Sequence, residues 1–496
     1  MRLDTAEILL TEEQRLEFTR IPPNIDDWEI AKHYTLSEED KKIINRRRRD
    51  YNRLGFAVQL GMLRNPGWAL TSFDEIPEPV LEYIAEQIGV NVNSIFEYSE
   101  RENTRLEHMK EIRKEYGYRN FREEDAEALF NTLMHAAMEN DNVIHLMNTA
   151  IASLRKQKII LPGITTIERI LQDARIKAES IVIERIKASI TSSQRALMDD
   201  LISSRDEDNN TKLGWLRDDF GYPSPKTFRE VILRLEEVRK LELNLNTDEI
   251  HPNRIRQLSR LGEKYKPFSF RRFDEKKRYA ILAVYLNELS QTLVDKAIEI
   301  HEKQINILLS KGRKKLESIQ KENGKSLNEK LIHYIGIGEA LIKAKKEGRD
   351  PLEAVESVMD WDKVESSVEE AKKLTRPANY DYIDLLDGRY SQLRKYSPLL
   401  LKHLKFKSSG QATQPLVDAL DLIQEMNEEG KRKVPLDAPV EFVSNRWSRY
   451  VFEDDGSINR HYYEMAALSE LKNKIRSGDV SVEGSRNYKD FDEYLA

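Results

Sequence analysis

The 496-residue sequence has no cysteine, only 16 prolines and 20 glycines, and no apolar run near the roughly 20 residues that span a membrane. The absence of cysteine excludes disulfide bonds and thiolate zinc sites. Few prolines and glycines leave long stretches in which nothing interrupts a helix. The first residues carry acids where a secretory signal peptide needs an apolar core. These absences fit a cytoplasmic protein with no membrane segment.

Charged residues make up 33% of the chain and hydrophobic residues 39%. The hydrophobic share is too high for a disordered chain, and the length suggests about three domains. The net charge of -6 does not by itself favour a nucleic-acid partner. Cations are concentrated locally, however, and local concentration decides which surfaces attract phosphate.

Helix signals follow one another along nearly the whole chain, so we predict a mainly α fold of several helical domains. These include a helix-turn-helix-like DNA-binding domain and a long amphipathic helix. The predicted blocks are an N-terminal helical DNA-binding domain (1–161), a second DNA-binding domain (162–250), a basic segment with the long helix and a dimerisation role (251–325), a helical linker or scaffold region (326–433) and a connector (434–496).

The first candidate DNA contact is a run of cations at the end of a predicted helix that Ser37 and Asp40 begin with a capping box. Seven cations fall within the thirteen residues 41–53. Phosphate contact relieves the repulsion among them. The alternative is a solvated helix end, neutralised by the acids that precede it. The residues predicted to contact DNA here are Arg46, Arg47, Arg48, Arg49 and Arg53.

The second candidate contact is a predicted helix-turn-helix. Helices over 193–202 and 211–218 are followed by a third, which Ser224 caps and Pro225 opens. Residues in the first turns of such a helix reach base edges in the major groove, so we predict base contacts by Lys226, Thr227 and Arg229. The alternative is an ordinary amphipathic helix in a bundle.

The third candidate contact is the segment 253–278, which has ten Lys and Arg, three acids and a local charge of +7. Within it, residues 266–273 (KPFSFRRF) interleave cations with aromatic rings, a mixture that suits backbone neutralisation and stacking. We predict DNA contact by Lys266, Arg271 and Arg272. The alternative has the phenylalanines in the core and the cations on the surface.

A long helix is predicted from Glu275 to Lys321, which contains one glycine and no proline. Its apolar positions are nearly a heptad apart, at Leu282, Leu286, Leu289, Leu293, Ala297 and Ile300. Such a seam is either a dimer interface or, more commonly, a face turned toward the core of its own domain.

Catalytic and metal residues are not predicted in this chain. The sequence has no P-loop, dinucleotide-binding, nucleophile-elbow or H-E-x-x-H motif. Adjacent acids such as Asp199 and Asp200 point apart and do not make a two-metal site. The run Arg460-His461-Tyr462-Tyr463 leaves a tyrosine recombinase as one alternative. A helical scaffold that binds proteins is another.

Several stretches of the sequence resemble the large transposases of the Tn-three family of replicative transposons. They are 53–60 (RLGFAVQL), 63–68 (LRNPGW), 442–447 (FVSNRW), 462–464 (YYE), 468–471 (LSEL), 476–479 (RSGD) and 482–486 (VEGSR). They occur in the family's order and together extend over most of the chain.

The resemblance implies sequence-specific binding of double-stranded DNA, at the terminal inverted repeats of a transposon, and a homodimer. It also implies an RNase-H-like catalytic domain with an Asp-Asp-Glu triad and two Mg²⁺ ions, following the stretch near Gly484. We therefore expect this chain to be the DNA-recognition and dimerisation half of a transposase in transposition and recombination. We expect no cofactor in the chain itself, with Mg²⁺ belonging to the absent catalytic domain.

Overall fold

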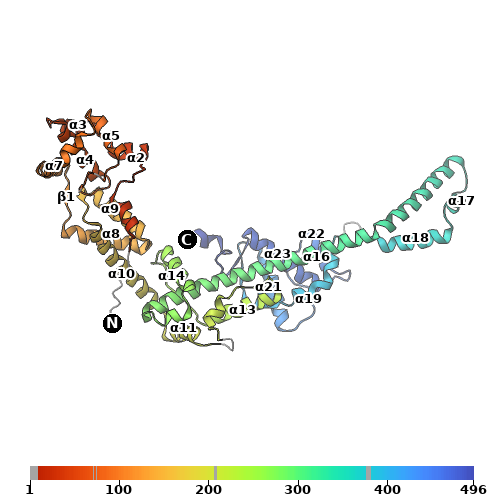
Figure 1. The fold of residues 1–496 in the computed structure, drawn as a ribbon. Helices are drawn as coiled ribbons and strands as arrows, with labels where there is room; N and C mark the ends of the chain where they lie inside the picture. The colour runs from red at the N-terminus through yellow and green to blue at the C-terminus, as the bar shows by residue number, and fades with distance from the viewer. Residues whose placement is uncertain (1–8, 71, 74, 206–208, 376–380, 496) are drawn as a thin grey trace. The chain divides into compact units, whose positions relative to one another are not determined.

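The computed structural model describes residues 9–70, 72–73, 75–205, 209–375 and 381–495 (Figure 1). The predicted fold class is confirmed, because helices dominate the described residues and the strands are only two or three residues long. The chain divides into two units. Unit 1 is Met1–Asp199 with Asn244–Tyr285, and unit 2 is Asp200–Leu243 with Leu286–Ala496. The five predicted blocks cut the chain at other points and stay a prediction.

Unit 1 is built from short and medium helices. Its elements are α1 (Glu12–Thr19), α2 (Asp27–Tyr34), α3 (Glu38–Ile44), α4 (Asp50–Arg64), α5 (Glu78–Ile88), α6 (Ser94–Ser99), α7 (Glu102–Tyr116), β1 (Arg119–Asn120), α8 (Glu123–Glu139), α9 (Val143–Lys156), β2 (Ile159–Ile160), α10 (Ile164–Ala188), α14 (Pro252–Lys264) and α15 (Pro267–Phe270). The strands β1 and β2 pair in parallel.

Helix α4 is the centre of the first core of unit 1, and nearly all of its residues are buried. The ring of Tyr98 lies against Gly55, where an added Cβ would be 2.1 Å from the ring, so only glycine fits there. The Tyr98 hydroxyl accepts a hydrogen bond from Gln59 Nε2 at 2.8 Å and lies 2.8 Å from His108 Nδ1. Burial, followed by the charge of Arg47, lowers the pKa of His108 to about 4. The imidazole is therefore neutral at pH 7.

A second core of unit 1 lies among α8, α9 and α10. The carboxylate of Asp141 binds Arg175 at 2.8 Å and lies 3.4 Å from Arg254 of α14. Burial raises the pKa of Asp141, but hydrogen bonds from Arg175 and Gln257 outweigh burial and leave the pKa below its usual value. This ionic cluster holds α14 against the core.

Unit 2 contains the remaining elements. They are α12 (Lys212–Arg217), α13 (Pro225–Arg239), α17 (Pro351–Glu356), α18 (Trp361–Leu374), the 3-10 helix η1 (Ile383–Arg389), α19 (Tyr390–Leu393), α20 (Ser397–His403), β3 (Phe406–Ser408), α21 (Gln414–Glu428), α22 (Asn445–Val451), α23 (Arg460–Ser477), β4 (Val480–Val482) and α24 (Phe491–Leu495). The strands β3 and β4 pair antiparallel.

Two helices belong to both units, namely α11 (Ser192–Ser203) and α16 (Glu275–Glu347). Helix α16 is 73 residues long, and it continues past Lys321, where the sequence prediction ended it, and through Gly324. A single glycine costs a helix only about 1 kcal/mol, which the neighbouring turns offset.

The apolar seam of α16 faces the core of its own chain. Leu282 and Leu286 are fully buried, and Leu293 is 1% exposed. Two residues after Leu293, Asp295 accepts hydrogen bonds from Ser485 Oγ at 2.5 Å and from the backbone N–H of Arg486 at 3.1 Å. The stretch near Gly484 thus packs on this helix, and the seam is not a surface open to a second copy.

The predicted cap of the third helix in the candidate helix-turn-helix is confirmed. The backbone N–H of Thr227 donates to Ser224 Oγ at 3.1 Å, and Pro225 takes the first helical position of α13. However, residues 218–224 separate α12 from α13. That connection is longer than the three- or four-residue turn of the motif, so the structure does not show a helix-turn-helix as such.

Shortening the buried Leu293 side chain should destabilise unit 2. We expect Leu293→Ala to lower the free energy of unfolding by about 2–5 kcal/mol, because it leaves a cavity in a closed core. Urea unfolding followed by circular dichroism measures the change. Lys303→Ala, at an exposed position of the same helix, is the matched control and should have almost no effect. Equal stability of the two variants would contradict the assignment of the seam to the core.

Candidate nucleic-acid interface

The run of four arginines lies in a turn and not on a helix, so the predicted helix end is wrong. Helix α3 ends at Ile44, and Asn45 follows as its C-cap. Asparagine competes for backbone hydrogen bonds and is a poor residue for a helix interior. Arg49 has an extended backbone and precedes α4. In this turn the four side chains do not follow the 100° rotation of a helix and meet different surroundings.

Arg47 is an internal residue. Its side chain is 8% exposed, its guanidinium lies 3.3 Å from the centre of the Phe56 ring, and it binds Glu111 at 2.7 Å. Burial lowers the pKa of Arg47, although the charge of Glu111 opposes this. Arg47 therefore stabilises the packing of α4 against α7 and is not available to a phosphate.

The other predicted arginines of this region remain accessible. Arg46 is 3.5 Å from Glu115, but its side chain is 60% exposed, so this surface pair is weak. Arg48 is exposed, and within the described ranges it has neither a hydrogen bond nor an ion pair. Arg53 is bound to Asp50 of its own helix, which partly neutralises it.

Arg101, at the start of α7, belongs with these residues, although no feature of the sequence pointed to it. Its guanidinium lies 4.6 Å from the centre of the Tyr51 ring, and Arg49 donates a hydrogen bond to the Tyr51 hydroxyl at 2.9 Å. No sequence signal links positions about fifty residues apart, so only the fold brings them together. We call Arg46, Arg48, Arg49, Arg53 and Arg101 the arginine cluster.

At the start of α13 the three predicted base-reading residues separate into two groups. Lys226 and Arg229 are exposed. Thr227 is only 7% exposed, and its hydroxyl donates to the carbonyl oxygen of Tyr222 at 2.7 Å. Thr227 thus closes the turn before the helix and cannot reach a base edge without breaking that turn.

The basic segment 253–278 also divides into internal and surface cations. Arg254 is 2% exposed and belongs to the Asp141 cluster. Near its end, Lys276, Lys277 and Arg278 each pair with an acid of α10 or α11. Five exposed cations form no ion pair to an acid among the described residues, namely Arg256, Arg260, Lys264, Lys266 and Arg272. Arg271 is exposed as well.

The three phenylalanines of this segment do not share one environment. Phe270 is fully buried, and Phe273 is partly buried in contact with it. Phe268 is 60% exposed, with the Arg272 guanidinium 4.4 Å from its ring centre. An exposed ring beside a guanidinium presents a flat apolar face and a positive charge, the combination that stacks on bases and contacts phosphate.

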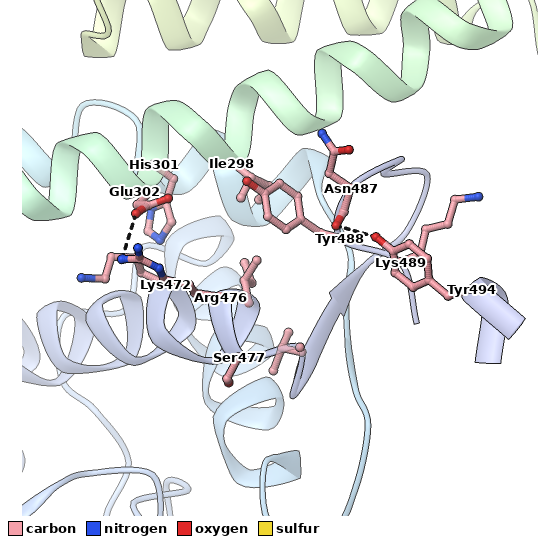
Figure 2. A pocket seen from close by; sticks show the side chains of 13 residues that line it. Ile298, His301, Glu302, Lys472, Arg476, Ser477, Asn487, Tyr488, Lys489 and Tyr494 are labelled. Atoms are coloured by element: carbon pink, nitrogen blue, oxygen red, sulfur yellow. Dashed lines mark hydrogen bonds and ion pairs between the residues drawn. The ribbon is translucent and has the colours of Figure 1, made fainter. Parts of the chain in front are cut away.

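A pocket of about 440 Å³ lies in unit 2 where α16, α23 and the residues after β4 meet (Figure 2). Its lining includes Lys472, Arg476 and Lys489, with Glu302 3.6 Å from Arg476. His301 at its edge is fully buried and lies 3.0 Å from the Tyr396 hydroxyl, and burial lowers its pKa to about 4. Residues 476–479 contribute to the resemblance to the transposase family, but no local pattern in the sequence predicts this pocket.

The geometry does not favour the tyrosine recombinase alternative. Tyr463 is fully buried and donates its hydroxyl to the carbonyl of Pro439 at 2.7 Å. Burial raises the pKa of Tyr462 to about 12, and its hydroxyl donates to the carbonyl of Asp384 at 3.2 Å. Arg460 binds Glu464 at 2.9 Å. The arginine and both tyrosines are thus engaged in packing unit 2.

Among the described residues, no group of three or more His, Cys, Asp or Glu side chains is arranged to hold a metal ion. No helix in the same ranges is both long enough and apolar enough to cross a membrane.

Single substitutions of arginine should distinguish internal arginines from surface arginines by their effect on the stability of unit 1. We expect Arg47→Ala to destabilise unit 1, because it leaves Glu111 without its partner and uncovers the Phe56 ring. Arg48→Ala, one residue away in the same turn, is the matched control and should leave stability unchanged. Thermal unfolding of both variants tests this expectation. Equal melting temperatures would contradict the assignment of Arg47 to the interior and Arg48 to the surface.

The chain is similar to known proteins along its whole length. Residues 9–174 match a family described as a domain of unknown function, DUF4158. The chain is 51% identical to the transposase for transposon Tn1546 of Enterococcus faecium, with 100% of this chain and 50% of the relative covered. It is 38% identical to the transposase for Tn3926 of Escherichia coli and 36% identical to that for Tn501 of Pseudomonas aeruginosa. In both cases 98% of this chain and 49% of the relative are covered.

The similarity thus extends over the whole chain, while the chain spans about half the length of the curated relatives it matches. The chain is homologous along its whole length to transposases of the Tn-three family, and it corresponds to about half of each of these relatives.

Proposed function

We propose that the chain binds double-stranded DNA at the terminal inverted repeats of a transposon and serves DNA transposition as the recognition part of a transposase. The similarity to transposases along the whole chain carries this proposal. The accessible cations of unit 1 support it, because several of them, such as Arg48, Arg256 and Arg260, are exposed and form no ion pair to an acid among the described residues. Phosphate contacts need such a surface, and they supply most of the affinity of a DNA-binding protein.

The accessible residues suggest a division of roles. The arginine cluster and the exposed cations of 253–278 would contact phosphates and set the position of the protein on the duplex. Lys226 and Arg229, at the start of α13, would contact base edges. Phe268 would stack on a base or sugar with Arg272 beside it. Arg47, Thr227 and the other buried residues of these segments would hold the contacts in place.

A helical scaffold that binds proteins is the competing function. A scaffold with incidental basic patches would bind DNA weakly and without sequence preference. Specific recognition would give a steep loss of affinity with salt together with preference for one duplex. Selection of bound duplexes from a random library separates the two functions and supplies the cognate sequence for the measurements below.

We also propose that the chain acts as a homodimer, because a transposon has two ends and each needs a recognition unit. The seam from Leu282 to Ile300 does not serve this purpose, since it is filled by the chain's own core. A dimer must therefore use another surface.

Removing accessible arginines should flatten the salt dependence of DNA binding. We expect the combined variant Arg46→Ala, Arg48→Ala and Arg49→Ala to lower the slope of log affinity against log salt by roughly one unit per lost phosphate contact. The loss should be similar on cognate and random duplexes. Fluorescence anisotropy at several salt concentrations measures it.

The matched control for this triple variant removes three exposed lysines from α16, at positions 314, 315 and 321. It changes the net charge equally but belongs to unit 2, whereas the arginine cluster belongs to unit 1. Equal slopes for the two triple variants would show that the cluster does not contact phosphate.

Arg229→Ala should reduce specificity more than general affinity. We expect a loss of about 1–3 kcal/mol on the cognate duplex and little on random DNA, because only the cognate base edge offers the guanidinium its acceptors. Lys240→Ala, at the other end of the same helix, is the control. Equal losses on both duplexes would make Arg229 a backbone contact.

A further inference from the structure

All fifteen residues of α13 are described, and four of them are exposed. Three of the four form one stripe. Lys226, Arg229 and Leu233 follow one another at three and four residues, which places them within about 60° of one another around an α-helix. The fourth, Arg239, lies on another side and donates to the carbonyl oxygen of His403 at 2.7 Å. The stripe is therefore the face that α13 offers to a partner in solution.

Leu233 is the apolar member of this stripe and is 50% exposed. A single exposed leucine is ordinary, but the charges that accompany this one are not. Lys226 and Arg229 are exposed and form no ion pair to an acid among the described residues. An apolar side chain in line with two unpaired cations suits a partner that presents an apolar group among negative charges.

The acids beside the stripe do not offset its positive charge, because each is already paired. Glu230 binds Arg234 at 2.6 Å, and Glu237, whose side chain is 18% exposed, binds Lys240 at 2.5 Å. At the start of the helix, the aligned peptide dipoles add a positive partial charge. The face therefore attracts a polyanion and carries one apolar side chain within it.

The turn before α13 holds this face in place. Arg234 is 1% exposed, donates to the carbonyl oxygen of Asp218 and lies 4.2 Å from the centre of the Phe220 ring. The Thr227 hydroxyl donates to the carbonyl oxygen of Tyr222 at 2.7 Å. Base contacts tolerate little displacement of the side chains that make them, so a recognition face needs support of this kind.

Double-stranded DNA presents one apolar group on the base edges of its major groove, the C5 methyl group of thymine. Guanine presents acceptors in the same groove, and arginine is the side chain that most often binds them. The recognition helix of a homeodomain makes its base contacts at the same spacing of three and four residues. The stripe of α13 has this spacing, with an arginine in its middle and a leucine at its end.

We propose that Leu233 contacts the C5 methyl group of a thymine in the transposon end and so determines the sequence preference at that base pair. This inference rests on the proposed binding of α13 to base edges, and it adds the base that the third position of the stripe reads. Four residues rise about 6 Å along a helix, and base pairs are about 3.4 Å apart. The thymine should therefore lie about two base pairs from the base that Arg229 contacts.

Replacing thymine with uracil removes only the methyl group and so tests this contact. Each thymine of the selected duplex is replaced in turn, and fluorescence anisotropy measures the affinity of the full chain for each duplex. We expect uracil at one position near the base that Arg229 contacts to lower the affinity about fourfold. This is the factor that corresponds to one methyl group no longer withdrawn from water.

Leu233→Ala should abolish this dependence on the methyl group. The variant should bind the thymine duplex about fourfold more weakly than the unchanged chain does, and it should bind the thymine and uracil duplexes equally. Leu233→Met keeps an apolar side chain of similar volume and should retain the uracil effect. Leu436→Ala, at a 78% exposed leucine of the same unit outside α13, is the matched control and should behave like the unchanged chain. Circular dichroism checks that all three variants are folded.

Equal affinity of the unchanged chain for the thymine duplex and for every uracil duplex would overturn the inference. A uracil effect of the same size in Leu233→Ala would also overturn it, since another residue would then contact the methyl group. In both cases a selected duplex would still support the proposed recognition function. Failure to select any duplex would instead overturn that function, and the role of Leu233 with it.

Discussion

The continuity of helix α16 is the constraint on which most of this structure depends. Its 73 residues supply side chains to the cores of both units, and no proline interrupts them. The apolar seam at its first half must stay buried, which requires the chain to return and cover it. The stretch near Gly484 does so, with Ser485 and Arg486 bound to the buried Asp295. Residues almost two hundred positions apart are thereby fixed to one helix.

The second half of the same helix lies under a different constraint. There α18 covers one face, while Leu331, Ile335 and Ile342 on another face are 59%, 53% and 60% exposed. The apolar face in the first half of α16 is thus covered by the rest of the chain. In the second half, one apolar face is covered and another is not. One continuous helix combines a packed core at one end with an uncovered apolar face at the other.

Cations serve two purposes in this chain, and burial decides which. Arg47, Arg234 and Arg254 are internal, each paired with a carboxylate and, for the first two, lying over aromatic rings. Their neighbours Arg48, Arg229 and Arg256 are exposed. A buried guanidinium must be paired because an uncompensated charge in the core is costly. The exposed members need no protein partner and are the ones that a phosphate can reach.

Local sequence by itself determined the helical class and many of the helix starts. Ser37 with Asp40, and Ser224 with Pro225, cap helices as their spacing predicts, because capping involves only residues three or four positions apart. It also showed in which segments cations are concentrated. It did not determine the end of α3, which a single asparagine sets, or the continuation of α16 through Gly324.

Only the tertiary structure decided which of those cations are accessible. Arg47 and Arg48 are identical and adjacent in sequence, yet one lies over Phe56 and the other faces solvent. Tertiary structure also joined Arg101 to Arg49 through Tyr51, and it turned the heptad seam inward while leaving the Leu331–Ile342 stripe uncovered. The physical reason is common to all of these. Periodicity shows that a face is apolar or charged, but burial depends on which distant segment packs on it, and contacts between distant segments leave no local pattern.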